Sequence, residues 1–163
     1  MIRKTELADV PRISEIHVFG WRDAYRGIVP DDYLFNTMLV AKRINYFAKA
    51  VHDCLEEIYV YDDGIVKAFM TIGACRDTDM IEAFELWGLY VDPFMQRQGI
   101  GTEMLDFCET KAIERGHTEV CIWVFEQNKN AIKFYETHGY SPDGTKKPID
   151  AFAIYEVRYL KQL

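Results

Sequence analysis

The hydrophobic positions of the first third of the chain repeat with the period of a helix. After a short extended segment at residues 2–4, apolar residues recur at every third position from Ile13 to Phe19. This spacing predicts an amphipathic helix over residues 9–24. A second helical stretch is expected over residues 30–52, because acidic residues at its start suit a helix N-terminus.

The pattern then changes to alternating or continuous apolar runs, which are typical of strands. Residues 58–72, with the turn Asp62-Asp63-Gly64 inside them, predict a β-hairpin. The elements expected next are a strand at 84–91, a helix at 99–115, a buried strand at 120–125, a helix at 128–137, a loop that contains Gly144, Lys146, Lys147 and Pro148, and a last strand at 152–160. This order predicts one α/β domain with a mixed sheet over residues 1–163.

Composition narrows the class of protein. The chain has 163 residues, of which 49% are hydrophobic, so it can bury a single core. Its formal net charge of −7 disfavours nucleic acid as a partner, because phosphate binding needs a basic surface. The cysteines form no C-x-x-C pair and the histidines are scattered, so no metal site is expected. No apolar run suits a signal peptide or a membrane span, and we expect a cytoplasmic protein with no membrane partner.

The most informative segment is a strand that leads through a short loop to two glycines at the start of a helix. It runs from Leu89-Tyr90-Val91 to Thr102. Glycine lets the backbone approach a ligand, and the free N–H groups of a helix N-terminus bind anions, so phosphate is the expected ligand. Arg97 and Thr102 can add side-chain contacts. A strand-to-helix turn without a ligand is the open alternative.

Two familiar phosphate motifs do not match this turn. A nucleoside-triphosphate loop carries Lys directly after its last glycine, which is absent after Gly101, and this disfavours phosphotransfer. A dinucleotide motif carries Gly or Ala at the position that Met104 occupies.

Two longer motifs together resemble the GNAT superfamily of acyltransferases. Gln96-x-x-Gly99-x-Gly101, after a Leu-Tyr-Val-Asp-Pro strand end, is similar to the pyrophosphate-binding motif of that family. Residues 126–140 are similar to its second signature, one helix and one strand further along the chain. The resemblance implies an α/β fold of the α+β type, with a mixed, mostly antiparallel central sheet flanked by helices on both faces.

The resemblance also implies an acetyl-CoA-dependent N-acetyltransferase. It implies that coenzyme A contacts the strand end, the glycine turn and the second motif, namely Leu89, Tyr90, Val91, Gln96, Arg97, Gln98, Gly99, Ile100, Gly101, Thr102, Asn128, Ala131 and Phe134. In this family the acceptor amine attacks the acetyl thioester directly.

Such a reaction needs an acid and a stabilised carbonyl oxygen. We expect Tyr135 to protonate the departing sulfur, although a core tyrosine is the alternative interpretation. The resemblance implies a bulge in the strand that ends at Val91, which aims a backbone N–H, that of Val91, at the carbonyl oxygen.

Glu85 is the candidate base, because a carboxylate is unusual in this apolar strand. Alternate residues of a strand share a face, which places Glu85 with Leu89 and Val91, and Glu82 on the opposite face. Glu85 would act through a water, with Glu82 or a water chain as alternatives. A salt-bridged strand carboxylate is an equally open interpretation of Glu85.

The acceptor is expected to be an amine. Trp21, Tyr25 and Trp87 are candidate acceptor-pocket residues that could equally belong to the core. Chain length and acidic charge lean toward a small-molecule amine over a protein N-terminus or lysine. An acyl-CoA sensor or scaffold without turnover is the rival class, and a homodimer would be in keeping with the family.

Overall fold

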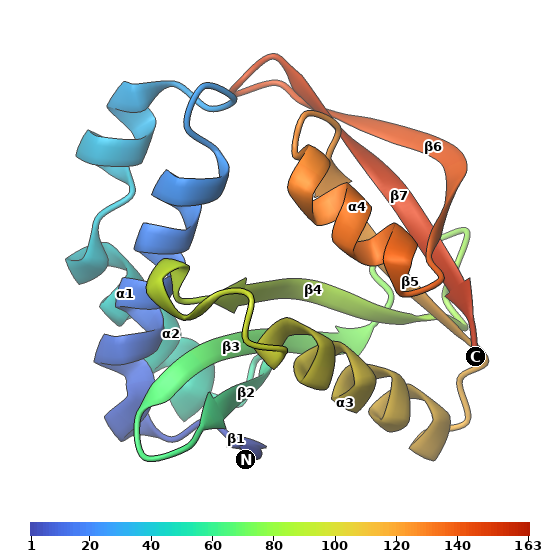
Figure 1. Ribbon diagram of the computed structural model, residues 1–163, viewed down its shortest axis with the longest axis horizontal. Coiled ribbons are helices and arrows are strands. Elements are labelled where there is room, and N and C mark those ends of the chain that lie inside the picture. Colours follow the sequence, from blue (N-terminus) through green and yellow to red (C-terminus); the bar gives the residue numbers. More distant parts are fainter.

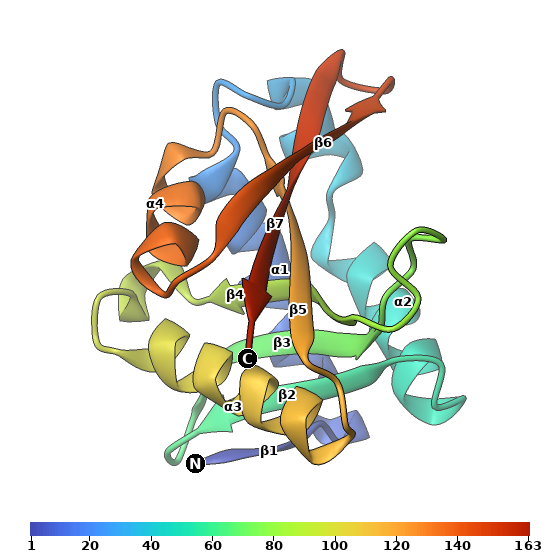
Figure 2. The same ribbon diagram turned by 90° about the vertical axis from the view of Figure 1, so that its right-hand side faces the viewer.

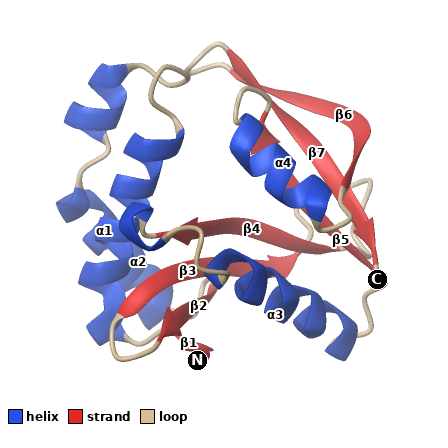
Figure 3. Ribbon diagram, viewed as in Figure 1, coloured by secondary structure: helices blue, strands red, loops and turns tan.

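The computed structural model describes residues 1–163 as a seven-stranded sheet with helices on both of its faces (Figure 1) (Figure 3). The strand order is β1-β2-β3-β4-β5-β7-β6, and every neighbouring pair is antiparallel except β4 and β5. The elements are β1 (Ile2–Lys4), α1 (Val10–Ala24), α2 (Val40–His52), β2 (Glu57–Asp62), β3 (Val66–Ala74), β4 (Phe84–Val91), α3 (Ile100–Glu114), β5 (Glu119–Phe125), α4 (Lys129–Thr137), β6 (Ser141–Ile149) and β7 (Ile154–Gln162). The predicted mixed, mostly antiparallel sheet is confirmed. None of the helices combines the length and the apolar character needed to cross a membrane.

Two predicted elements need correction. The second helical stretch is divided, because Tyr33–Thr37 form a separate π-helical turn and the extended backbone of Leu39 precedes α2. The segment expected as a loop before the last strand is strand β6. Its prolines and lysines disfavour a central strand, but β6 lies at the edge of the sheet and pairs with β7 alone, where such residues are tolerated.

The helices bury the two faces of the sheet in separate cores. Ile13 and Ile16 of α1 pack with Phe47 of α2 and Phe69 of β3 on one face. On the other face, α3 packs Met104 against β3, β4 and β5. Residues of β5 are buried on both faces, which explains its nearly continuous apolar sequence.

The parallel strands β4 and β5 pair over only part of their length. Residues 84–86 pair with residues 120–122, and no pairing follows. Beyond that point the strands diverge and leave a gap between their C-terminal ends (Figure 2). The carboxyl ends of neighbouring parallel strands are a common place for a ligand site.

Candidate active site

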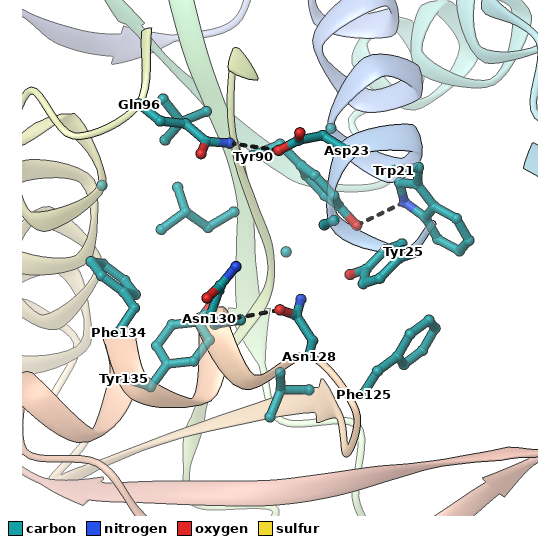
Figure 4. Close-up of a pocket in the computed structure, with 18 of the residues that line it drawn as sticks. Trp21, Asp23, Tyr25, Tyr90, Gln96, Phe125, Asn128, Asn130, Phe134 and Tyr135 are labelled. Atoms are coloured by element: carbon teal, nitrogen blue, oxygen red, sulfur yellow. Dashed lines mark hydrogen bonds between the residues drawn. The ribbon is translucent and has the colours of Figure 1, made fainter. Parts of the chain in front are cut away.

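A cavity of about 830 Å³ fills the gap between β4 and β5. Its walls come from the C-terminal end of α1, the end of β4, the turn before α3, the end of β5, helix α4 and the segment around the β6–β7 connection. Figure 4 shows labelled side chains from α1, β4, the turn before α3, β5 and α4 around a shared space. Sixteen of the 28 lining residues are hydrophobic, so the cavity suits a ligand with an extended apolar part.

The turn before α3 exposes a row of backbone donors. Arg97 and Gly99 both adopt left-handed backbone conformations, with φ of 61° and 83°. The N–H groups of residues 97–102 have no acceptor in the protein, and the first helical hydrogen bond runs from Glu103 N to Gly99 O. Successive free N–H groups at a helix N-terminus form an anion-binding concavity. The turn therefore fits a pyrophosphate, as the sequence predicts.

Gly101 lines the cavity at the start of α3, opposite Phe134 of α4. A Cβ at this position would lie 3.4 Å from the ring of Phe134 and 4.0 Å from Val91. At the opposite side of the cavity mouth, Gln96 donates a hydrogen bond of 3.4 Å to Asp23 of α1. Of the predicted turn residues, Gln98 is the one that is not part of the cavity wall.

The side chain of Thr102 is held by a histidine that the sequence did not single out. Nδ1 of His138 lies 2.7 Å from the carbonyl oxygen of Phe134, which assigns the ring proton to Nδ1. Nε2 then accepts the hydroxyl proton of Thr102 at 3.0 Å. In this arrangement the Thr102 hydroxyl is engaged with His138, while the backbone N–H of Thr102 has no acceptor in the protein.

Strand β4 presents backbone groups to the gap. Asp92 N donates to Lys67 O on β3 at 2.8 Å, so the N–H of Asp92 points toward β3. Because N–H directions alternate along a strand, those of Val91 and Leu89 point the opposite way, toward the diverging β5. These groups are available to a carbonyl oxygen in the cavity.

Helix α4 and its N-cap bring four predicted residues to the same cavity, namely Asn128, Ala131, Phe134 and Tyr135. Asn128 caps the helix, because its Oδ1 accepts a hydrogen bond from Ala131 N at 3.1 Å, and its amide nitrogen remains free. Tyr135 is 8% exposed and lines the cavity. Its hydroxyl makes no hydrogen bond to the protein, and burial raises its pKa, which keeps the phenol protonated.

The candidate acceptor residues Trp21 and Tyr25 stand on the wall formed by α1. The Trp21 indole donates a hydrogen bond of 3.1 Å to the hydroxyl of Tyr90 (Figure 4). The Tyr90 ring packs on His17 at 4.7 Å, so this side chain belongs to the α1 side of the sheet. Tyr25 lies 4.6 Å from Phe125 between ring centres. From the sequence, Trp21 and Tyr25 could be either pocket residues or core residues. The structure shows both, because the two side chains line the cavity and also pack in the small core behind it.

Glu85 is not on the face assigned from the sequence. A bulge at Trp87 places one extra residue of β4 between consecutive pairs with β3. The extra residue reverses the alternation, so Leu86 and Leu89 both pack on the α3 side of the sheet. Glu85 therefore faces away from Leu89 and Val91. Simple alternation fails here because a bulge adds a residue that period two does not include.

The surroundings of Glu85 are those of a structural ion pair. It is 1% exposed, lies outside the cavity wall, and accepts hydrogen bonds from the backbone N–H of Arg76 at 2.9 Å and from its Nε at 3.1 Å. Glu82 is exposed in the turn before β4 and is also outside the cavity. Ligand atoms of Cys75, Glu85 and Cys121 lie within 4.8 Å of one another, a group that sequence spacing did not predict. The positively charged guanidinium of Arg76 already occupies the Glu85 carboxylate, and this disfavours a metal ion at the same place.

Several cavity residues were missed by the sequence analysis, notably Asp23, Trp123, Phe125, Phe152 and Glu156. Phe125 and Glu156 are direct partners in the β5–β7 ladder and share a face. Alternation along the last strand could have predicted that Glu156 and the buried Val157 lie on opposite faces. Only the positions of the neighbouring strands show that the face of Glu156 borders a cavity.

Known proteins share both the sequence pattern and the fold. Residues 20–140 match the model of the Acetyltransferase (GNAT) family. The chain is 32% identical over 164 residues to YuaI, an uncharacterized N-acetyltransferase of Bacillus subtilis, and the match covers 96% of this chain and 87% of that protein. Its fold is similar to that of the PaiA N-acetyltransferase of Thermoplasma acidophilum, solved in complex with coenzyme A, with a TM-score of 0.75, 20% identity, and coverage of 100% and 98% of the two chains. YncA of Salmonella typhimurium, solved with acetyl-CoA, has a TM-score of 0.70, 18% identity, and coverage of 100% and 93%.

Proposed function

This chain belongs to the GNAT acetyltransferase family, and from this premise we propose that it transfers the acetyl group of acetyl-CoA directly to a primary amine. One observation carries the proposal. The free N–H groups of residues 97–102 stand at one end of a cavity that also receives the unpartnered hydroxyl of Tyr135. The cavity thus has a phosphate-binding group at one end and a proton donor further along. This arrangement suits a cosubstrate such as acetyl-CoA, which carries a pyrophosphate at one end and a thioester at the other.

The turn holds the pyrophosphate of coenzyme A. Its N–H groups donate to the phosphate oxygens, and the positive end of the α3 dipole adds to the attraction. Support comes from the left-handed conformations of Arg97 and Gly99, which aim these groups at one point. Ala131 and Phe134 pack beside the arm of the cosubstrate, and the free amide nitrogen of Asn128 donates to it.

Acetyl-CoA supplies the activated acetyl group, and the remaining work belongs to the chain. The amine attacks the carbonyl carbon, so that a C–N bond forms and the C–S bond breaks. The N–H groups of Leu89 and Val91 stabilise the negative charge that develops on the carbonyl oxygen. Tyr135 donates its phenolic proton to the departing sulfur and regains a proton from water.

The proton of the acceptor leaves through water in the cavity. We do not assign Glu85 as the base, since its carboxylate is buried against Arg76 and has no access to the cavity. A sensor without turnover would need the phosphate-binding end alone, and a buried tyrosine hydroxyl without a protein partner favours the enzyme. Small-molecule and peptide amines are both within this proposal.

The test is calorimetric titration with coenzyme A and acetyl-CoA, with ATP and NAD as controls, followed by a thiol-release assay over a panel of primary amines. We expect selective binding of the two coenzyme A compounds and amine-dependent release of thiol. Equal indifference to all four ligands would overturn the proposal. Binding without thiol release for any amine would favour the sensor.

A further inference from the structure

A lysine that is not itself part of the cavity wall contacts two residues that are. Nζ of Lys147 lies 3.9 Å from the centre of the Trp123 ring and 3.2 Å from Oε2 of Glu156. Lys147 and Glu156 are direct partners in the β6–β7 ladder. Trp123 and Glu156 both line the cavity. An ammonium group therefore already sits between an aromatic face and a carboxylate, which is a common way to recognise amines.

Trp123 and Glu156 are held by contacts that do not involve Lys147. The Trp123 indole donates a hydrogen bond of 2.8 Å to Asp77, and Glu156 stands opposite Phe125 in the β5–β7 ladder. Only 19% of the Glu156 side chain is exposed, against 41% of the Lys147 side chain. The lysine is thus the exposed half of the pair. Its ammonium group is therefore the member of the pair that can move out to water, while Glu156 stays in the wall.

The surrounding charge favours a cation. Arg158 is 4% exposed and forms ion pairs with Asp77, Asp79 and Asp143, so this cluster holds three negative charges against one positive charge. The cluster lies beside Trp123, whose ring centre is 5.6 Å from the Arg158 guanidinium. An anionic acceptor would be repelled from this side of the cavity.

The walls around this subsite are aromatic and adjoin the acid. Phe152 packs on Tyr33 at 4.7 Å, and Tyr25 packs on Phe125 at 4.6 Å between ring centres. Burial, and after it the nearby Tyr90, Tyr135 and Glu156, raise the pKa of Tyr25. Tyr25 therefore lies within electrostatic range of both the acid and the ammonium subsite.

We propose that Trp123 and Glu156 form the subsite for the acceptor's ammonium group, that Lys147 fills this subsite in the free protein, and that the acceptor is a primary ammonium compound with an apolar body. The inference rests on the proposed function and narrows its acceptor class. An acceptor that enters displaces Lys147 and takes over its two contacts.

The experiment uses the full chain saturated with coenzyme A and titrates it with phenethylammonium, with 2-phenylethanol as the neutral probe. Glu156→Gln removes the carboxylate and should weaken phenethylammonium binding about tenfold. Lys147→Met removes the internal competitor and should tighten binding about threefold or more. Lys146→Met is the matched control, because Lys146 is the adjacent lysine of β6 but pairs with Glu126 at 2.5 Å and not with Glu156. This control should bind as the wild type does.

The opposite signs expected for Glu156→Gln and Lys147→Met keep the test decisive if one variant folds poorly. Wild-type binding in both variants, equal affinity for 2-phenylethanol, or no phenethylammonium binding by any protein would overturn the subsite. The affinity for coenzyme A is measured in the same preparations and tests the proposed function separately. Where coenzyme A does not bind, the proposed function fails, and titration of the free protein still decides the subsite.

Discussion

The two ends of the cavity are built from different parts of the polypeptide. The phosphate-binding end consists of backbone N–H groups of residues 97–102, which one turn aims at a common point. The acceptor end consists of side chains, among them Trp21, Trp123 and Glu156, that come from three distant elements. A site made of backbone depends on the absence of a Cβ, whereas a site made of side chains depends on their identity. Substitutions should therefore affect the two ends by different rules.

The largest effect is expected at the phosphate-binding end. Gly101→Trp places a large ring beside Phe134 and Val91, where it fills the cavity next to the free N–H groups of the turn. We expect the loss of measurable coenzyme A binding in calorimetry. The matched control is Ile113→Trp, at a position on the same helix that is 59% exposed. Unchanged affinity in Gly101→Trp would contradict the backbone-made site, provided that thermal unfolding shows a folded protein.

At the junction of the two ends, Tyr135→Phe should lower kcat about 100-fold, which is typical of a lost general acid, and leave the Kd for acetyl-CoA nearly unchanged. Tyr140→Phe is the control, because Tyr140 is also buried but donates its hydroxyl to Glu109 at 3.1 Å. Since burial raises the pKa of Tyr135, its deprotonation should not limit kcat below about pH 10. Weak cofactor binding with normal turnover at saturation would remove the acid role.

Glu85→Gln separates structure from chemistry. The substitution removes a buried charge that accepts several hydrogen bonds from Arg76, and we expect a loss of about 2–3 kcal/mol in the free energy of unfolding. The kcat should stay within a few-fold of the wild type. Urea unfolding and thiol release measure the two quantities. A fall in kcat with unchanged stability would restore Glu85 as the base.

The smallest expected effect concerns the support of the acceptor wall. Burial lowers the pKa of His17 from 6.5 to about 3, so the folded protein holds this ring neutral beneath Tyr90. The unfolded chain binds a proton near pH 6.5, so the stability that His17 contributes at pH 7 is lost as the pH falls below that value. Between pH 7 and 5.5 the loss is about 1 kcal/mol. His17→Phe should remove this loss, whereas His52→Phe, at an exposed histidine, should keep it. Equal pH profiles for wild type and His17→Phe would contradict the assignment.

The phosphate-binding end could be predicted from the sequence because its signals are local. Two glycines, the preceding strand and the following helix lie within residues 84–115, and each element forms where the pattern indicated. The acceptor end could not be predicted in the same way. A bulge at Trp87 reverses the faces of β4. The family resemblance implies a bulge in this strand, but the strict alternation that assigns a face to Glu85 does not include it. The pairing of Lys147 with Glu156 required strand β6, whose prolines and lysines suggested a loop.

If the proposed cosubstrate binds in the gap between β4 and β5, the stability of the fold should depend on that ligand. The gap is an interruption in an otherwise continuous ladder, and the N–H groups of Leu89 and Val91 have no strand to receive them. A ligand arm that carries amide groups can take the place of the missing strand and complete the sheet. At a ligand concentration of about 100 times Kd, such binding adds about 2.7 kcal/mol to the free energy of unfolding. Resistance to proteolysis should then rise and fall with the supply of coenzyme A.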